Sequence, residues 1–160
     1  MRTQELFDFP LMLFCSLHRL SLGHEFPTDI VRIKIPGQLF DEWTTYSIAY
    51  AILLGSARAL DVPDVDLSVT ITGAGGGNEH AIILYDNVPG GAGLVADLIN
   101  PSSMINALKH ARERVKDDGC GCDESCYGCL RSYRNQFAHP HLRRKDALRI
   151  LDAILDRVEN

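Results

Sequence analysis

The sequence has no apolar run long enough to cross a lipid bilayer. The run from Pro10 to Leu22 is about 13 residues long, whereas a membrane-spanning helix needs about 20. A secretory leader is missing as well, because Glu5 and Asp8 interrupt the region that would carry positive charge and no small-residue cleavage site follows. These absences predict a cytoplasmic protein with no membrane partner.

An excess of positive charge is also missing. The chain carries 16 Lys and Arg against 21 Asp and Glu, a formal charge of −5, which excludes a generic polyanion binder. The five cysteines are unevenly placed, because four fall in one short stretch and Cys15 stands alone in an apolar run. This usage is typical of a reducing compartment, and we expect Cys15 to be a small core residue.

The length and composition predict one domain. With 160 residues and 46% hydrophobic content, the chain is long enough to bury one core but too short for two. We predict a single domain over residues 1–160, with an α/β core over 1–118 and a zinc knuckle with a basic helical tail over 119–160.

Hydrophobic periodicity and turn residues predict the secondary structure. Helices are expected over 9–22, 41–60, 102–116 and 144–158, and strands over 28–35, 66–72 and 80–85. A glycine-rich connection makes the last two strands antiparallel, and a crossover helix joins the first strand to them. The predicted fold class is therefore α/β (α+β), with a small mixed sheet of about three strands covered by helices, a four-cysteine zinc knuckle and C-terminal helices. The helix over 9–22 is apolar nearly all round, so we expect it to be buried here or against another polypeptide.

The cysteine cluster has the spacing C-x-C-x3-C-x2-C and consists of Cys120, Cys122, Cys126 and Cys129. Thiolates this close in sequence can converge on one tetrahedral ion, and Zn²⁺ favours sulfur ligands in that geometry. An iron–sulfur cluster usually takes a distant ligand, and two local disulfides would be strained, so both are weaker alternatives. Because all four ligands come from the protein, the predicted zinc ion is structural. Gly121 and Gly128 provide the backbone freedom and room that such a tight loop needs.

A second glycine-rich stretch follows the third predicted strand. Gly91-x-Gly93-x-x-Ala96 fits the relaxed dinucleotide fingerprint, but no second parallel strand ending in an acid follows it. A tight strand-to-helix turn is therefore the favoured interpretation. A phosphate bound by exposed amides at Gly90–Gly93 is the alternative left open.

The charge balance reverses between Tyr127 and Arg149, where six positive side chains stand against Asp146 alone. Tyrosine, asparagine and histidine are interleaved with these cations, a composition that suits a nucleic-acid backbone. The candidate nucleic-acid-binding residues are Arg131, Arg134, Asn135, His139, Arg143 and Arg144. The alternative is that the cations offset the thiolate cluster and pair with acids elsewhere.

Aromatic residues recur at helical spacing in the helix expected over 41–60. Trp43, Tyr46 and Tyr50 form the set. Such a stripe can stack bases, but it is more often core, and we favour the core interpretation.

Two long motifs resemble one known family. The first is Leu84-Tyr85-Asp86-Asn-Val-Pro-Gly-Gly-Ala-Gly93. The second joins the cysteine cluster to Leu-Arg-Ser-Tyr133-Arg-Asn135-Gln136, His139, Leu142 and Arg144. The stretch from Leu22 to Asp29 and the helix containing Trp43 are similar too. Nearly the whole chain thus resembles the MrfA-like zinc-binding domain found at the C-terminus of helicases.

The resemblance implies an accessory domain of superfamily 2 DExH-type helicases, among them a DNA-repair helicase and proteins of anti-phage systems such as DISARM and Druantia. In that family the four cysteines hold one structural zinc. This sequence has no Walker A motif and no DExH box, so we expect it not to be the motor. We expect either a free-standing version that docks onto a separate helicase subunit, or the trailing piece of a split gene.

The function predicted by this resemblance is a non-catalytic module with zinc as cofactor. Its expected partners are a helicase subunit or helicase domain and DNA, with no small-molecule substrate. Two alternatives stay open. One is a small metal-dependent nuclease using Asn135, His139 and His141, although no carboxylate stands beside these histidines in sequence. The other is a purely protein-binding adaptor, against which salt-dependent DNA binding would argue.

Overall fold

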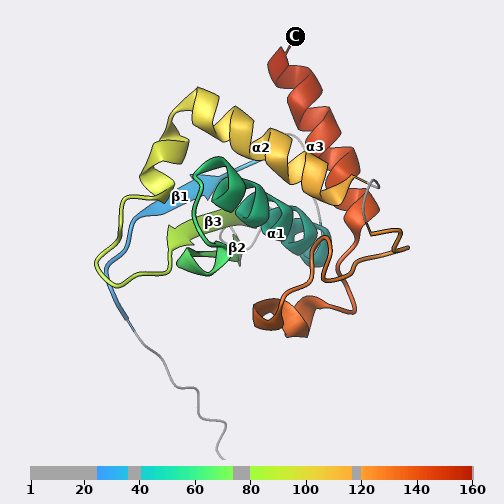
Figure 1. Ribbon diagram of the computed structural model, residues 1–160, viewed down its shortest axis with the longest axis horizontal. Helices are drawn as coiled ribbons and strands as arrows, with labels where there is room; N and C mark the ends of the chain where they lie inside the picture. Colours follow the sequence, from blue (N-terminus) through green and yellow to red (C-terminus); the bar gives the residue numbers. More distant parts are fainter. Residues whose placement is uncertain (1–24, 36–40, 74–79, 117–119, 160) are drawn as a thin grey trace, which may run out of the picture.

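The computed structural model describes residues 25–35, 41–73, 80–116 and 120–159. The helix predicted over 9–22 and the glycine-rich connection over 74–79 lie outside them. The described elements are β1 (Ile30–Ile33), α1 (Glu42–Ala59), η1 (Asp64–Asp66), β2 (Leu67–Gly73), β3 (His80–Asp86), η2 (Val95–Ile99), α2 (Pro101–Val115), η3 (Tyr133–Ala138) and α3 (Arg144–Glu159), where η is a 3-10 segment (Figure 1). Over these residues, every helix is too short or too polar to cross a membrane.

The three strands form one sheet in the order β1–β3–β2. Ile82 of the central strand pairs with Ile33 on one side and with Ile71 on the other. The α/β fold class is confirmed, but the expected mixed pairing needs correction because both hydrogen-bonded pairs are antiparallel. Since β1 and β2 both run opposite to β3, they are parallel to each other, and α1 is the predicted crossover between them. The strand β3 separates them, so no parallel pair forms.

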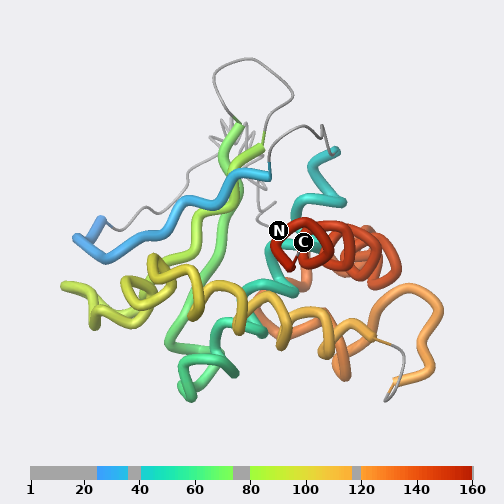
Figure 2. Tube along the Cα trace, turned by 90° about the horizontal axis from the view of Figure 1, so that it is seen from above, coloured from blue at the N-terminus to red at the C-terminus, as the bar shows by residue number. Residues whose placement is uncertain are grey.

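Helix α1 is the centre of the fold and contacts β2, β3, α2 and α3 (Figures 1 and 2). Its start is fixed by Asp41, whose side chain accepts hydrogen bonds from the backbone N–H groups of Trp43 and Thr44 at 3.0 Å each. Near its end, a Cβ added to Gly55 would lie 2.3 Å from the carbonyl oxygen of Ala107 in α2. The two helices therefore pack backbone to backbone at this point.

Buried apolar side chains form two clusters. The sheet-side cluster joins α1, the sheet, η2 and α2, and consists of Ala57, Leu67, Leu84, Val95, Leu98 and Ala107. The helix-side cluster joins the three helices to the chain between α2 and α3, and includes Ile48, Ile52, Val115, Cys129, Leu130, Ala138, Leu142 and Leu151. Full burial of one Leu or Ile contributes about 1.5–3 kcal/mol, so the second cluster ties the cysteine-bearing chain firmly to α1.

Candidate metal centre

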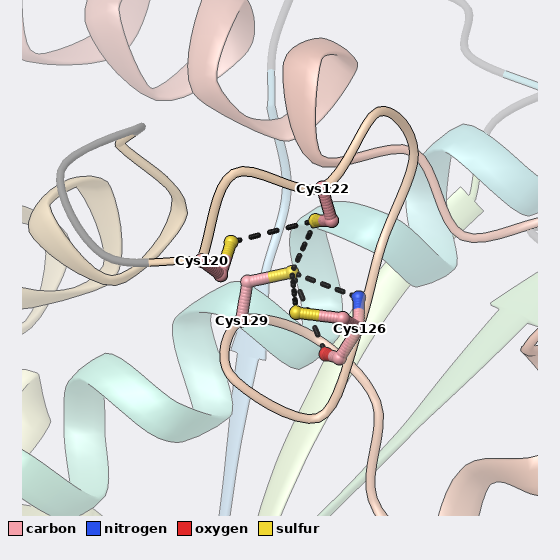
Figure 3. Close-up of side chains that lie close together, drawn as sticks. All are labelled: Cys120, Cys122, Cys126 and Cys129. Carbon is pink, nitrogen blue, oxygen red and sulfur yellow. Dashed lines mark hydrogen bonds between the residues drawn. The ribbon is translucent and has the colours of Figure 1, made fainter.

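The four cysteines come together on the chain that follows α2 (Figure 3). Their sulfur atoms all lie within 4.8 Å of one another. Neighbouring Sγ atoms are 3.4 Å (Cys120–Cys122), 3.7 Å (Cys122–Cys129) and 3.9 Å (Cys126–Cys129) apart. A tetrahedral zinc with Zn–S bonds of about 2.3 Å places its sulfurs about 3.8 Å apart, whereas a disulfide needs about 2.05 Å. The four thiols are free, and their spacing fits one zinc ion with four protein ligands.

Backbone hydrogen bonds give this sulfur set its shape. The N–H of Cys126 donates to the sulfur of Cys129 at 3.2 Å, and the N–H of Gly128 donates to the sulfur of Cys126 at 3.3 Å. Gly121 has a positive φ of 56°, and a Cβ on Gly128 would lie 3.1 Å from that of Cys120. Both glycines therefore do what the sequence predicted, one through its backbone angle and the other through the room it leaves.

The thiols differ in how readily they ionise. The backbone N–H of Cys122 lowers the pKa of Cys120 to about 7. Removal from water, reinforced by the neighbouring sulfurs, raises the pKa of Cys122 to about 12, and burial raises the pKa of Cys129 as well. Four thiolates at these distances repel one another, so a divalent cation is what makes the fully deprotonated set stable.

Arginine side chains next to the loop offset its charge. One Zn²⁺ with four thiolates carries a net charge of about −2. Arg144 is only 2% exposed, and its Nη2 donates to the Cys122 carbonyl at 2.9 Å while its Nη1 donates to Val115 at 3.2 Å. Arg114 Nε donates to the Cys129 carbonyl at 3.2 Å. Because the two guanidinium groups bind carbonyls of ligand residues, they also orient the loop. This geometry favours the charge-offset interpretation for Arg144.

Two of the predicted nucleic-acid-binding residues are partly exposed beside the metal centre. Arg131 Nε donates to Ser125 Oγ at 3.0 Å. Arg143 pairs with Glu124 at 2.8 Å, and the two side chains are 41% and 55% exposed. An ion pair this exposed contributes about 0–1 kcal/mol. Arg143 can therefore exchange its carboxylate for a phosphate at little cost.

Arg134 binds the sheet. Its Nη1 donates to the carbonyls of Val65 and Leu67 at 3.1 and 3.3 Å. Its Nη2 donates to Ser68 Oγ at 2.6 Å. Three acceptors on η1 and β2 thus pin η3 to the edge of the sheet. Nucleic-acid contact by Arg134 stays a prediction beside this structural contribution.

Asn135 and His139 form an internal set of hydrogen bonds. Asn135 is 1% exposed; its Nδ2 donates to the Leu130 carbonyl at 2.9 Å, and its Oδ1 accepts from the N–H of Ser132 at 2.8 Å. His139 Nε2 lies 2.9 Å from Asn135 Oδ1 and 3.0 Å from the Ser132 carbonyl. These bonds fold the chain directly after the last cysteine. The predicted contact of this pair with nucleic acid stays a prediction.

The same region offers little support for a hydrolytic centre. His141 stacks on Trp43 with ring centroids 3.9 Å apart, whereas His139 is bound to Asn135. Within the described residues, the four cysteines are the one group of His, Cys, Asp or Glu side chains close enough to share an ion. A hydrolytic ion needs an open coordination position, and a closed set of four thiolates has none.

Asp86 organises the glycine-rich turn after β3. Its carboxylate is completely buried, and Oδ2 accepts hydrogen bonds from the N–H groups of Ala92 and Leu94 at 2.8 and 3.0 Å. Its Oδ1 accepts from the N–H of Val95 at 2.9 Å. No function was predicted for Asp86 from the sequence. The signal for it was an aspartate at the end of an apolar strand, a residue type that is rarely buried unless paired.

A second carboxylate completes the turn. Asp29 Oδ2 accepts from the N–H of Gly93 at 3.2 Å, and a Cβ added to Gly91 would lie 2.5 Å from the same oxygen. The amides that would hold a phosphate are thus already bound, and the two carboxylates would repel an anion. These bonds contradict the phosphate alternative for Gly90–Gly93 and support the tight turn, which leads first into η2 and then into α2.

Comparison with known proteins places these observations in a family context. The model of the MrfA Zn-binding domain family matches residues 48–130, a range that contains the whole cysteine cluster. The Druantia protein DruE of Escherichia coli (strain UMEA 4076-1) is 29% identical over an alignment of 150 residues, and the match covers 79% of this chain and 8% of DruE.

A likeness in fold extends to a solved structure. The crystal structure of the DUF1998 helicase MrfA bound to DNA aligns with a TM-score of 0.54 at 17% sequence identity, and the match covers 78% of this chain and 17% of that one. At this identity the likeness shows a common fold. In both comparisons the chain spans a small part of the relative.

Proposed function

This chain belongs to the MrfA Zn-binding domain family, and from this premise we propose that it is a non-catalytic accessory module of a DNA helicase. One structural zinc, held by the four cysteines, fixes the segment over 120–143 against α1. The observation that carries the proposal is the closed sulfur set, whose distances of 3.4 to 3.9 Å suit a tetrahedral ion. Such a site stabilises structure and leaves no coordination position for a reacting group.

The helicase partner is supported by the names of the relatives, one a Druantia protein and the other a helicase bound to DNA. The 160 residues contain neither a Walker A motif nor a DExH box. In our proposal ATP hydrolysis therefore belongs to a helicase subunit or helicase domain, in cytoplasmic DNA repair or anti-phage defence. No small-molecule substrate takes part.

The proposed DNA contact lies on the basic segment. Arg131 and Arg143 are partly exposed beside the metal centre, and Lys145 and Arg149 are exposed on α3. Arg131 follows the zinc loop directly and Arg143 pairs with Glu124 inside it, so in our proposal the ion determines how these two cations are presented. Arg134, Asn135, His139 and Arg144 support the same surface through the internal bonds described above.

Salt-dependent DNA binding tests this contact. Fluorescence anisotropy with a labelled single strand should give an affinity that falls as salt rises. Arg131→Ala and Arg143→Ala should each weaken binding and reduce the salt slope by about one. Arg58→Ala is the matched control, because Arg58 is an exposed arginine on α1 outside the basic segment. Absence of binding at low salt would instead favour the protein-binding adaptor.

The helicase partnership is tested separately. The tagged chain should copurify with a DExH helicase that mass spectrometry identifies, and it should stimulate ATP-driven unwinding by that helicase. The Cys126→Ser variant should lose the stimulation while ATP hydrolysis by the helicase alone is unchanged. Equal stimulation by the metal-free variant would contradict the proposed contribution of zinc.

A further inference from the structure

A groove lined with tyrosine lies where α1, β2 and η3 meet. It has a volume of about 490 Å³, a size suited to a small organic group. The chain has five tyrosines, and four of them, Tyr46, Tyr50, Tyr85 and Tyr133, line this groove. Tyr46 and Tyr50 pack against the helix-side cluster, as the predicted core stripe requires, and both stay partly exposed.

Two aromatic rings of the groove are nearly parallel, and a third stands edge-on to one of them. Tyr46 and Tyr50 lie one helical turn apart on α1, with ring centroids 6.0 Å apart and planes within 16°. The two rings are therefore offset-stacked on each other, and each stays partly exposed where it lines the groove. Phe137 stands edge-on to Tyr46, at 81° and a centroid distance of 5.5 Å. Near-parallel rings beside an open groove favour a planar ligand.

The mouth of the groove is formed by exposed rings on a rigid support. Tyr133 is 83% exposed and Phe137 is 58% exposed. Arg134 lies between them in sequence, and its guanidinium is fixed by Val65, Leu67 and Ser68. A ring held on a pinned segment loses little conformational freedom when a ligand binds.

The polar groups of the groove suit a neutral ligand with a hydrogen-bonding edge. Arg134 and Asp64 both line it, so their charges balance. Burial raises the pKa of Tyr50 to about 12, and its hydroxyl, protonated at neutral pH like that of any tyrosine, can donate a hydrogen bond. The part of a nucleotide that is planar, neutral and edged with donors and acceptors is its base.

We propose that this groove binds an unpaired base of single-stranded DNA, which stacks on Tyr46, Tyr50 and Tyr133. The proposal rests on the DNA contact proposed above and adds a stacking site that this contact does not require. Because aromatic stacking tolerates every base, we expect little sequence preference. The rival occupant is an aliphatic peptide of the helicase, which would gain less from near-parallel ring faces.

The test compares two oligonucleotides that carry the same phosphates. One is an oligothymidylate, and the other has the same length with abasic sites in place of the bases. Fluorescence anisotropy of the full chain at constant salt should show that the oligothymidylate binds about tenfold more tightly, as base stacking on aromatic residues predicts. Tyr133→Ala should remove most of this difference, and Tyr133→Phe should keep it.

Tyr127→Ala is the matched control. Tyr127 is the fifth tyrosine, is 62% exposed and does not line the groove, so this variant should keep the preference for bases. Equal affinity for the two oligonucleotides would overturn the stacking site and leave the phosphate contact standing. No binding of either at low salt would overturn the DNA contact itself. Loss of helicase copurification in Tyr133→Ala, without a base preference in the wild type, would assign the groove to a peptide.

Discussion

The layer formed by the sheet with α1 and α2 keeps its shape by burying apolar side chains, whereas the segment over 120–143 adds sulfur and hydrogen bonds to the few apolar side chains that it buries. Leu67, Leu84 and Val95 are completely buried in the layer. The segment contains one short 3-10 element, and Arg144, Arg114 and Asn135 donate directly to its carbonyls. A stretch with little regular structure is thus ordered by individual bonds. The surface proposed to meet DNA is the surface whose order depends on an ion.

Loss of the metal should give the largest effect and should separate the two regions. Zinc ligation stabilises small sites by about 10–16 kcal/mol, so Cys126→Ser or a strong chelator should leave 120–143 disordered. Amide hydrogen exchange should show lost protection there and retained protection in β3 and the sheet side of α1. Mass spectrometry of the metal should find one zinc per wild-type chain and none in the variant.

The control for this experiment is Cys15→Ser, which removes the cysteine outside the cluster and should leave the zinc content unchanged. Uniform loss of protection over α1, β3 and 120–143 would contradict the comparison, because it would mean that both regions unfold as one cooperative unit.

A substitution inside the layer should lower the stability of the fold without affecting zinc binding. Gly55→Ala places a Cβ 2.3 Å from a backbone oxygen of α2, and backbone atoms cannot move aside as a flexible side chain can. We expect a loss of about 3 kcal/mol in the free energy of unfolding, measured by urea denaturation, with zinc retained. Gly73→Ala is the matched control, because nothing lies within 4 Å of the added atom. A loss of zinc in Gly55→Ala would show that the layer and the metal centre are coupled.

The helix cap of α1 should give the smallest effect and depend on pH. Hydrogen bonds from Thr44 lower the pKa of Asp41 below its usual value of 3.8. The folded state therefore favours the carboxylate, so its contribution is complete above the unfolded pKa and is lost as pH falls through the folded pKa. Asp41→Ala should cost about 1 kcal/mol at neutral pH, and the difference from wild type should shrink on acidification.

Asp41→Asn is the control for the cap, since an amide oxygen accepts the same bonds without titrating. It should keep most of the stability and remove the pH dependence. Urea denaturation over a pH series measures both variants. A wild-type advantage over Asp41→Ala that stays constant in acid would assign the stabilisation to something other than the carboxylate charge.

Local signals in the sequence were enough to predict most of the helices and strands. Periodicity marked both α1 and α3, because amphipathicity depends on neighbours in the chain. The pairing of β1 was different. Which strand lies beside β1 depends on contacts between distant residues, and the pattern of β1 is the same with either neighbour.

At the metal centre too, features set by neighbours in the chain were predictable, and features set by tertiary structure were not. The spacing of the four cysteines predicted the zinc site, because ligands close in sequence need no knowledge of the fold. The contacts of Asp86, Asn135 and Arg144 were not predictable, since each binds backbone groups that tertiary structure brings near. From sequence alone, a charged residue is expected at the surface, and Arg144 was accordingly predicted to bind nucleic acid.

The four ligands lie between Cys120 and Cys129, and this compactness has a consequence for biogenesis. Gathering groups so close together costs little loop-closure entropy. The four ligands can therefore gather on an ion before α3 packs against the rest of the chain. Metal supply in the cell would then act while the chain folds, by deciding in which molecules the segment over 120–143 becomes ordered.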